Sequence, residues 1–465
     1  MRAAVIVAVG ALLLASCTSS KRGPAPSPPV AAPTTSSADS PTTTPLAAPS
    51  VDWPTYHGDA ARSGVSRTFP RPAKLTVMAS LGLDEAVYAS PIVARGITIV
   101  ASENNTVYAL DTAGRQLWRT HLGDPVPGVE LPCGNIDPSG ITATPIYDRA
   151  TDSVFVVPEY RAPVRHELVA LAVQTGMARW RVGIDLPGAS ANAMQVRGAL
   201  AIAAGRVWVP FGGRNGDCGD YKGRVVGVPV SGSGPVIAYT VPTTRQAGIW
   251  TPPGPSVDSR GRLIVSVGNG ESGTGDPYDY SDSVLAIDPP TARLVDSFSP
   301  TTWAMDNEAD RDLGSQGPAL IGSGWVFIAG KSGVAYVLRQ DQFGGIGGQV
   351  TEQELCRSFG GTAVDDAVVY VPCTDGMCAV RVGTDGSITV LWHADAGIAG
   401  SPVVGGGRVW ALDQRAGVLH ALDPANGRST AQIQVGQTTR FATPALSGGH
   451  VLVPTLSGIT IVSVT

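Results

Sequence analysis

The sequence predicts an all-β protein, an eight-bladed β-propeller whose last blade is closed by a strand from the N-terminal part of the chain. A unit of four short β-strands, separated by turns rich in Asn, Asp and Gly, recurs along the chain. In several copies the unit opens with Ser-Pro or Thr-Pro, and the seven intervals between Pro91 and Pro444 average about 50 residues. The last copy ends before a fourth strand, so an outer strand must come from elsewhere.

The clearest copy covers residues 89–120. Its predicted strands are residues 90–93, 97–101, 106–110 and 116–120. Turns at residues 103–105 and 111–114 separate runs of four to six β-forming residues, which is typical of antiparallel hairpins. One such meander leaves an apolar face uncovered, so it requires neighbours.

A close second copy occupies residues 401–427, and weaker copies lie between the two. The predicted second strands of the second to sixth blades are residues 154–157, 206–209, 262–267, 325–329 and 368–371. The last copy begins at Thr443, and we expect residues 73–78 to pair with residues 459–464 and complete it, leaving no unpaired sheet edge. Seven blades are the alternative if the loop-rich region 185–245 is not a full blade.

The N-terminal residues indicate export. Met1 and Arg2 precede an apolar run, residues 3–14, that is too short to span a bilayer and fits the core of a signal peptide. The Leu-Ala-Ser-Cys sequence of residues 14–17 resembles the bacterial lipobox, whose cysteine is lipidated. We therefore expect residues 1–17 to be a lipoprotein signal peptide with Cys17 as the lipidated residue. An ordinary signal peptide with an incidental cysteine is the alternative.

Residues 18–51 are rich in Pro, Ser and Thr and contain no aromatic residue, so we expect a disordered tether. Residues 52–465 then form the propeller. This division predicts a protein held by its lipid on the extracytoplasmic face of a bacterial cell membrane, which is its first expected partner. The net charge of −5, spread without blocks, argues against nucleic acid as a partner.

Five cysteines follow Cys17, and an exported protein favours disulfides. Cys133 and Cys218 lie in long polar loops of adjacent repeats, so we expect a bridge between two blades. Cys373 has two possible partners, Cys356 or Cys378, of which we favour Cys356. The chain has no Cys-x-x-Cys-His motif and only six scattered histidines, which argues against covalent haem and against zinc.

The first repeat contains Ala109, Asp111, Gly114 and Trp118, and related residues recur at Ala170, Gly176 and Trp180. This pattern resembles the tryptophan-docking unit of the pyrroloquinoline quinone (PQQ) repeat propellers, in a bacterial lipoprotein branch, and the resemblance covers nearly all of residues 53–465. It implies that Asp and Gly form a turn and that the indole packs between blades. A lipidated propeller of this type also resembles the scaffold lipoprotein of the outer-membrane β-barrel assembly machinery.

The order Trp250, Asn269, Asp310 is similar to the calcium-holding part of quinoprotein dehydrogenases. The resemblance implies Asn269 as a metal ligand and Asp310 or Asp312 as the catalytic base, because Ca²⁺ takes hard oxygen ligands and a carboxylate can remove an alcohol proton. The chain departs from that pattern: the vicinal cysteine pair is missing, and neither the acidic ligand nor the basic residue that reads the quinone carboxylates is identified.

The sequence supports two functions. The first is an extracytoplasmic binding or scaffold module for a protein, a glycan or a small ligand, with no cofactor. The alternative is a PQQ- and calcium-dependent dehydrogenase of alcohols or polyols. The loop carboxylates Asp276, Asp279 and Asp282 lack the terminal Glu of an EF-hand, so we expect a solvated loop there and not a calcium site.

Overall fold

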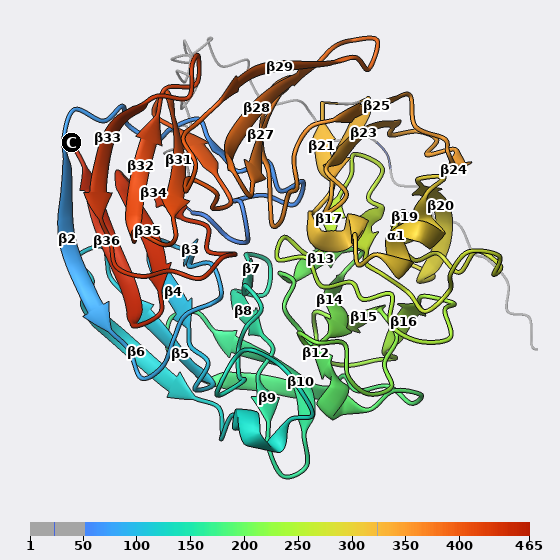
Figure 1. The fold of residues 1–465 in the computed structure, drawn as a ribbon. Coiled ribbons are helices and arrows are strands. Elements are labelled where there is room, and N and C mark those ends of the chain that lie inside the picture. Colours follow the sequence, from blue (N-terminus) through green and yellow to red (C-terminus); the bar gives the residue numbers. More distant parts are fainter. Residues whose placement is uncertain (1–22, 24–51, 323) are drawn as a thin grey trace, which may run out of the picture. The chain divides into compact units, whose positions relative to one another are not determined.

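The computed structural model describes residues 23, 52–322 and 324–465. The described residues from 52 onwards form eight sheets, built mainly of antiparallel strands and arranged in a ring (Figure 1). The eight-bladed propeller is therefore confirmed, and the seven-bladed alternative is wrong, because the region 185–245 forms a complete blade. Cys17 and the expected signal peptide and tether lie outside the described residues.

The first four blades are formed in chain order, each from its inner to its outer strand. Blade 1 contains β3 (Ile92–Ala94), β4 (Ile97–Ala101), β5 (Thr106–Leu110) and β6 (Gln116–His121). Blade 2 contains β7 (Ile146–Asp148), β8 (Ser153–Val156), β10 (Arg165–Ala172) and β11 (Ala178–Gly183), with β9 (Glu159–Tyr160) beside β10. Blade 3 contains β13 (Ala201–Ala203), β14 (Arg206–Gly213), β15 (Arg224–Pro229) and β16 (Ile237–Thr240), with β12 (Met194–Gln195) beside β14. Blade 4 contains β17 (Ser256–Val257), β18 (Leu263–Val267), β19 (Ser283–Asp288), β20 (Arg293–Ser299) and β24 (Gly345–Ile346).

The other four blades follow the same pattern. Blade 5 contains β21 (Ala319–Ile321), β22 (Trp325–Ala329), β23 (Val334–Arg339) and β25 (Thr351–Glu354). Blade 6 contains β26 (Ala363–Asp365), β27 (Val368–Cys373), β28 (Gly376–Val382) and β29 (Ile388–His393). Blade 7 contains β30 (Val403–Gly405), β31 (Arg408–Asp413), β32 (Val418–Leu422) and β33 (Ser429–Gln434), with β1 (Val65–Ser66) parallel to β30. Blade 8 contains β34 (Ala445–Ser447), β35 (His450–Thr455), β36 (Gly458–Val464) and β2 (Leu75–Gly82).

The ring closes in blade 8. The outer strand β2 pairs with the C-terminal strand β36 from Leu75 opposite Val464 to Gly82 opposite Gly458. The backbone N–H groups of Ala73 and Lys74 donate to the Thr465 carbonyl at 2.8 and 2.7 Å. The predicted pairing of residues 73–78 with residues 459–464 is confirmed, and it joins the two ends of the propeller in one sheet.

Apolar residues fill the spaces between neighbouring blades, so the core is divided into clusters that each bridge adjacent sheets. Trp118 of blade 1 illustrates the docking between blades. Its indole N–H donates to the Val173 carbonyl of blade 2 at 2.9 Å. Gly176 lies under the ring, where an added Cβ would lie 2.4 Å from the indole, so a side chain does not fit. Trp180 packs in the same way on Gly232 of blade 3.

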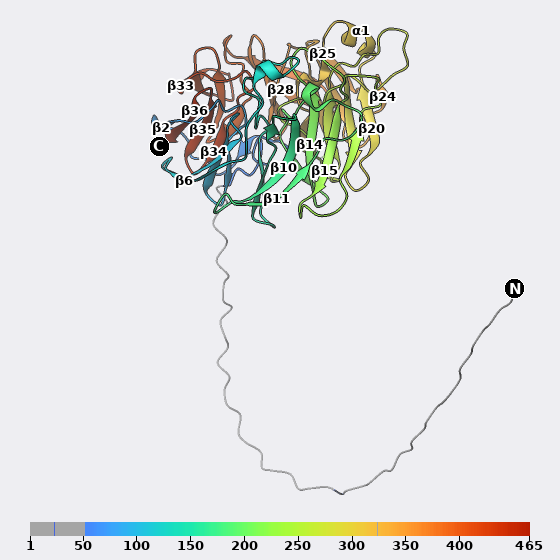
Figure 2. The same ribbon diagram turned by 90° about the horizontal axis from the view of Figure 1, so that it is seen from below.

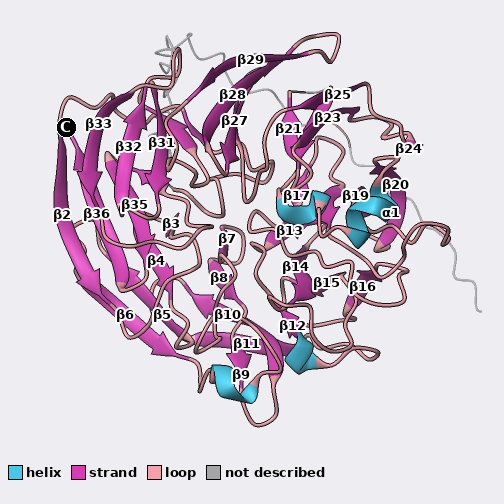
Figure 3. Ribbon diagram, viewed as in Figure 1, coloured by secondary structure: helices cyan, strands magenta, loops and turns pink. Residues whose placement is uncertain are grey.

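The helices are short and lie in loops. They are α1 (Trp303–Glu308), η1 (Gly128–Glu130), η2 (Ala191–Ala193) and η3 (Leu313–Ser315). Figure 2 shows α1 on one face of the ring, and Figure 3 shows how strands dominate the fold. Within the described part of the chain, the helices are too short and too polar to cross a bilayer.

Residues 53–64, called here the crossing segment, contact the inner strands of the ring. Backbone hydrogen bonds join Trp53 to Val93, the Pro54 carbonyl to Tyr147 and the Gly64 carbonyl to Val404. His57 is buried and contacts the Thr443 hydroxyl at 3.0 Å. Burial lowers the pKa of His57 to about 3, so the imidazole is neutral and acts in packing.

Candidate functional site

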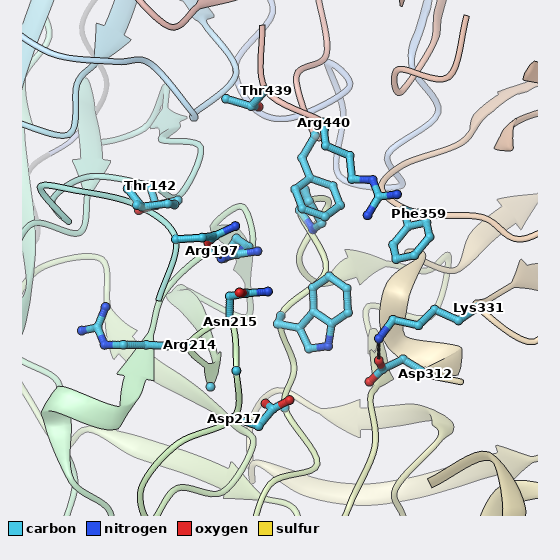
Figure 4. Close-up of a pocket in the computed structure, with 18 of the residues that line it drawn as sticks. Thr142, Arg197, Arg214, Asn215, Asp217, Asp312, Lys331, Phe359, Thr439 and Arg440 are labelled. Atoms are coloured by element: carbon cyan, nitrogen blue, oxygen red, sulfur yellow. Dashed lines mark hydrogen bonds and ion pairs between the residues drawn. The ribbon is translucent and has the colours of Figure 1, made fainter. Parts of the chain in front are cut away.

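A cavity with a volume of about 1120 Å³ lies in the centre of the ring. It is lined by loops that lead from the outer strand of one blade to the inner strand of the next, and by loops between second and third strands. Tyr56 of the crossing segment also lines it. Figure 4 shows cationic, acidic and aromatic side chains that meet around this space.

Trp250 provides the aromatic surface of the cavity. Two glycines allow its close approach: an added Cβ on Gly212 would lie 2.6 Å from the Trp250 Cβ, and one on Gly268 would lie 2.8 Å from its indole nitrogen. The Phe441 ring meets the indole edge to face, with 6.2 Å between centroids. The indole is thus fixed by backbone on one side and by an aromatic ring on another.

The structure brings the three predicted site residues together. Asn269 follows β18, and its amide group donates to Asp310 Oδ1 at 2.8 Å. The backbone N–H of Asn269 donates to Asp312 Oδ1, also at 2.8 Å. Asp310 and Asp312 come from the loop between α1 and η3, in the connection from blade 4 to blade 5.

Lys331, in the loop after β22, bridges both aspartates. Its ammonium donates to Asp310 Oδ1 at 2.7 Å and forms an ion pair with Asp312 Oδ2. The two carboxylates differ in exposure, because the Asp310 side chain is 74% exposed and the Asp312 side chain 8%. Both oxygens of Asp312 have partners, whereas Asp310 Oδ2 accepts no hydrogen bond from the described residues, and Asp310 is one of the residues that line the cavity.

Burial and charge set the protonation of this cluster. Burial raises the pKa of the Asp312 carboxyl above its usual range, although Lys331 opposes this. Burial also lowers the pKa of Lys331, but the attraction of Asp312 and Asp310 outweighs it and the net shift is upward. Behind them, burial and the proximity of Asp312 raise the pKa of Asp282 well above its usual range.

The Asn269 side-chain oxygen is buried and has no hydrogen-bond partner. A buried acceptor of this kind costs free energy unless a donor or a cation satisfies it. Among the described residues, however, no group of three or more His, Cys, Asp or Glu side chains could hold a metal ion. The protein alone therefore offers one amide oxygen here, and not a complete calcium cage.

The opposite wall is cationic and aromatic. Arg440 stacks on Phe359, with 4.2 Å between the guanidinium carbon and the ring centroid. Arg197 lies 5.8 Å from the Phe441 centroid and donates to Gln195 at 3.0 Å. Burial lowers the pKa of Arg197, although a guanidinium group in a protein keeps its charge.

A buried ionic network supports the wall at blades 2 and 3. Arg214 forms an ion pair with Glu159, and both side chains are buried. The Ser139 hydroxyl donates to the other Glu159 oxygen at 2.7 Å. Close by, Glu103 accepts the Gly140 N–H at 2.7 Å, and burial raises the pKa of Glu103 to about 8. Separating Arg214 from Glu159 would leave each charge buried without a partner, which is costly. The pair therefore holds this part of the wall in one arrangement.

Both predicted disulfides are present and both lie beside the cavity. Cys133–Cys218 joins the loop that carries Asn135 to the loop that carries Asn215, and so links blades 2 and 3. Cys356–Cys373 connects the segments that carry Arg357 and Thr374. The pairing favoured for Cys373 is confirmed, and Cys378 is a buried free thiol.

The loop between β18 and β19 differs from its sequence-based expectation. We expected a solvated loop, but Asp279 and Asp282 are buried. Asp279 accepts the Ser281 hydroxyl at 2.6 Å and the Thr243 hydroxyl at 2.8 Å. Asp276 is exposed and accepts the Gly273 N–H at 2.9 Å. The carboxylates are used in separate local hydrogen bonds, which explains why they do not converge on a cation.

Sequence reasoning missed several charged residues of the site. They lie one to three residues after the end of the second strand, as Asn269 does in blade 4. Arg214 and Lys331 line the cavity, and Glu103 and Glu159 belong to the buried network beside it. Aligning the repeats on their second strands, and reading the residue that follows, would have found them. Arg197, Arg357 and Arg440 lie in irregular connections and carry no such signal.

The comparisons with known proteins agree with this architecture. A family model described as outer membrane protein assembly factor BamB matches residues 73–273 and 281–464. The chain belongs to this family. BamB from Moraxella catarrhalis superposes with a TM-score of 0.57 at 18% identity, covering 84% of this chain and 98% of that one. The resemblance to PQQ-repeat propellers is therefore confirmed at the level of family and fold.

Two solved structures of higher structural similarity are dehydrogenases. A quinohemoprotein alcohol dehydrogenase from Comamonas testosteroni has a TM-score of 0.69 at 16% identity, over 89% of this chain and 80% of that one. A europium-containing methanol dehydrogenase has a TM-score of 0.69 at 14% identity, over 89% of this chain and 98% of that one. At these identities the likeness shows the fold alone.

One curated relative is closer in sequence. A polyvinylalcohol dehydrogenase from Sphingopyxis sp. (strain 113P3) is 27% identical over 257 residues, which are 44% of this chain. The matched region spans 38% of that relative, so the chain aligns with well under half of the relative's length.

Proposed function

We propose that this protein is a quinone-dependent dehydrogenase that oxidises an alcohol in the central cavity. The observation that carries the proposal is the cluster of Asn269, Asp310 and Lys331 beside the Trp250 indole. Two donors, the Asn269 amide and the Lys331 ammonium, fix one oxygen of Asp310. Its other oxygen accepts no hydrogen bond from the described residues, and the side chain is 74% exposed and lines the cavity. A general base needs this combination of fixed position and open access.

The residues present fit pyrroloquinoline quinone, which is planar and carries three carboxylates. Trp250 offers a flat aromatic face, and Arg197 and Lys331 supply positive charge at the cavity wall. When bound, the quinone accepts the two electrons that alcohol oxidation releases. The names of the relatives, an alcohol, a methanol and a polyvinylalcohol dehydrogenase, support the same chemistry.

Calcium fits in part. Asn269 offers one unsatisfied oxygen, and the described residues lack a group of carboxylates that would complete the shell. A calcium ion at Asn269 therefore requires oxygens from a bound ligand and from water. For this reason the dependence on calcium is an experimental variable in the test below, and the proposal does not depend on it.

The roles of the two aspartates follow from their contacts. Asp310 is the base, because its free oxygen is accessible to a hydroxyl group of the substrate. Asp312 is a positioning residue, because both of its oxygens are engaged and its side chain is buried. Lys331 contacts both carboxylates, which reduces their mutual repulsion and holds Asp310 Oδ1 in place.

The test is reconstitution of the purified protein with PQQ, with and without calcium, followed by reduction of an artificial electron acceptor in the presence of alcohols. Quenching of tryptophan fluorescence in the wild type, compared with that in Trp250→Phe because the chain has nine tryptophans, reports quinone binding separately. We expect Asp310→Asn to lose turnover by about 10²- to 10⁴-fold while quinone binding persists. Asp276→Asn, an exposed loop carboxylate, is the matched control. Absence of both quenching and turnover in the wild type would refute the proposal.

The scaffold function predicted first from the sequence is the second candidate. The family description names an assembly factor, which favours it. A scaffold does not require carboxylates and a cation clustered in a cavity that an indole also lines, so we place the enzyme first. Capture of a stable partner from a membrane extract, by protein that binds no quinone, would reverse this order.

The lipid anchor at Cys17 and the extracytoplasmic location remain part of the proposal. Mass spectrometry of the mature N-terminus tests both, since lipidated Cys17 as first residue is the expected result. An unmodified N-terminus beyond Cys17 would contradict the lipid anchor, and an uncleaved N-terminus at Met1 would contradict both.

A further inference from the structure

The cavity is positively charged within an acidic chain. Six cationic side chains and three carboxylates line it, although the whole chain has a net charge of −5. Four of the cations have polar partners in the protein: Arg197 with Gln195, Arg214 with Glu159, Arg311 with Asp306, and Lys331 with Asp310 and Asp312. The protein itself therefore supplies polar partners for these four cations.

Arg357 and Arg440 are different. Within the described part of the chain, neither guanidinium group forms a hydrogen bond or an ion pair with another residue, and both residues are exposed to the cavity. Contacts nevertheless restrain the side chain of Arg440 and the backbone of Arg357. Arg440 is stacked on Phe359, and the Arg357 carbonyl accepts the Thr374 N–H at 2.9 Å beside the Cys356–Cys373 disulfide.

Two guanidinium groups without an acidic partner line one cavity, and each presents a planar set of N–H donors without acceptors. That arrangement matches an oxyanion such as a carboxylate or a phosphate group. The cavity also has room for more than a single small ligand, since about 1120 Å³ exceeds the usual range for one drug-sized molecule.

We infer that Arg357 and Arg440 bind an anionic group on the substrate itself, so that the alcohol oxidised in this cavity is a hydroxy acid or a hydroxy phosphate. In the reaction the alcohol O–H proton passes to Asp310, the two electrons and the remaining proton of the C–H bond pass to the quinone, and a carbonyl group forms. The anionic group is unchanged and serves as a handle. This inference rests on the proposed function and adds the substrate class to it.

The kinetic test compares substrates that differ in one anionic group. D-Gluconate is compared with D-sorbitol, and glycerol 3-phosphate with glycerol, on the PQQ-reconstituted protein. We expect the KM of the anionic member to be lower by about 10- to 100-fold, the range of a charge-assisted hydrogen bond. The first pair of substrates tests recognition of a carboxylate and the second tests recognition of a phosphate group. Comparison of the two pairs shows which anionic group the arginines bind.

Variants connect this preference to the two arginines. Arg357→Gln and Arg440→Gln are each expected to raise the KM for the preferred anion about tenfold and to leave kcat unchanged, because the handle is bound equally before and during the reaction. The KM for the uncharged partner should not change. Arg381→Gln, an exposed arginine on the outer part of blade 6, is the charge-matched control.

Calorimetry without quinone separates this inference from the proposed function. Gluconate or glycerol 3-phosphate should bind the wild type more tightly than sorbitol or glycerol, and the two arginine variants should lose that difference, even if the protein shows no dehydrogenase activity. Equal binding of charged and uncharged compounds would overturn the inference. A loss of quinone binding in both variants, with unchanged substrate KM, would also overturn it and would assign these arginines to the cofactor.

Discussion

Replacing Lys331 by Met tests the ion-pair cluster most directly. The side chain keeps its apolar stem but loses the ammonium group that contacts both Asp310 and Asp312. Asp312 then retains the Asn269 N–H as a donor and loses its only ion-pair partner in the described residues. Because the Asp312 side chain is 8% exposed, water compensates poorly for the lost charge.

The size of the effect follows from burial. Removing one member of a fully buried pair typically costs about 3–5 kcal/mol, and an exposed pair about 0–1 kcal/mol. Lys331 is 20% exposed, so we expect a loss of about 2–3 kcal/mol in the free energy of unfolding at pH 8. The pKa of Asp312, already raised by burial, rises further when Lys331 is absent, so the folded variant takes up a proton more readily than the unfolded chain. The loss should therefore diminish as the pH falls toward 5.

Urea denaturation of wild type and Lys331→Met at pH 5 and pH 8 measures this difference. Asp310→Asn is the control for stability, since its side chain is 74% exposed and its replacement should cost less than about 1 kcal/mol. The double variant Lys331→Met/Asp312→Asn should recover part of the loss at pH 8. A loss for Lys331→Met that is greater at pH 5 than at pH 8, or absent at both, would refute the reasoning.

Three further predictions concern the frame of the site. Trp118→Ala removes an indole that donates to the Val173 carbonyl, and should lower the free energy of unfolding, measured by urea denaturation, by about 2–3 kcal/mol. A loss below about 0.5 kcal/mol would contradict a role of this indole in docking the blades. The double variant Cys133→Ser/Cys218→Ser opens an 85-residue closure and should lose about 4 kcal/mol, so an unchanged urea midpoint would argue against it. Burial raises the pKa of Glu103 to about 8, so the free energy of unfolding of the wild type should fall as the pH rises from about 5 to 8. Glu103→Gln should flatten that slope. Parallel stability–pH curves for the two proteins would show that Glu103 does not titrate in this range.

The repeat pattern was enough to predict the architecture, for physical reasons that Asp111 and Trp118 make clear. Asp111 accepts the Ala113 and Arg115 N–H groups at 2.9 and 2.8 Å, and Gly114 adopts a positive φ of 81° in the same turn. These are local requirements, parts of which recur in several copies and are visible in a single sequence. The closing pair β2–β36 was predictable because an unpaired edge had to be covered.

Residues of the site could be predicted from the sequence only where they occupy a fixed place in the repeat. Asn269 could be placed because it comes two residues after a second strand, and Lys331 has the same position in the next blade but was not recognised. Its role depends on Asp310 and Asp312, and contact between them arises only when adjacent blades pack. Arg357 and Arg440 are 83 residues apart in sequence and meet one cavity through the closure of the ring, which no local pattern reports.

The crossing segment, residues 53–64, contributes both to the ring of blades and to the cavity. Arg62 is buried and donates to the Leu200 carbonyl at 2.8 Å and the Pro255 carbonyl at 3.1 Å, so it ties blade 3 to blade 4. Tyr56, six residues earlier, lines the cavity. The segment that holds the inner strands together therefore also forms part of the cavity wall. The same backbone therefore supports the ring and shapes the cavity. The charged residues of the cavity lie on loops, and this support helps to hold those loops in place.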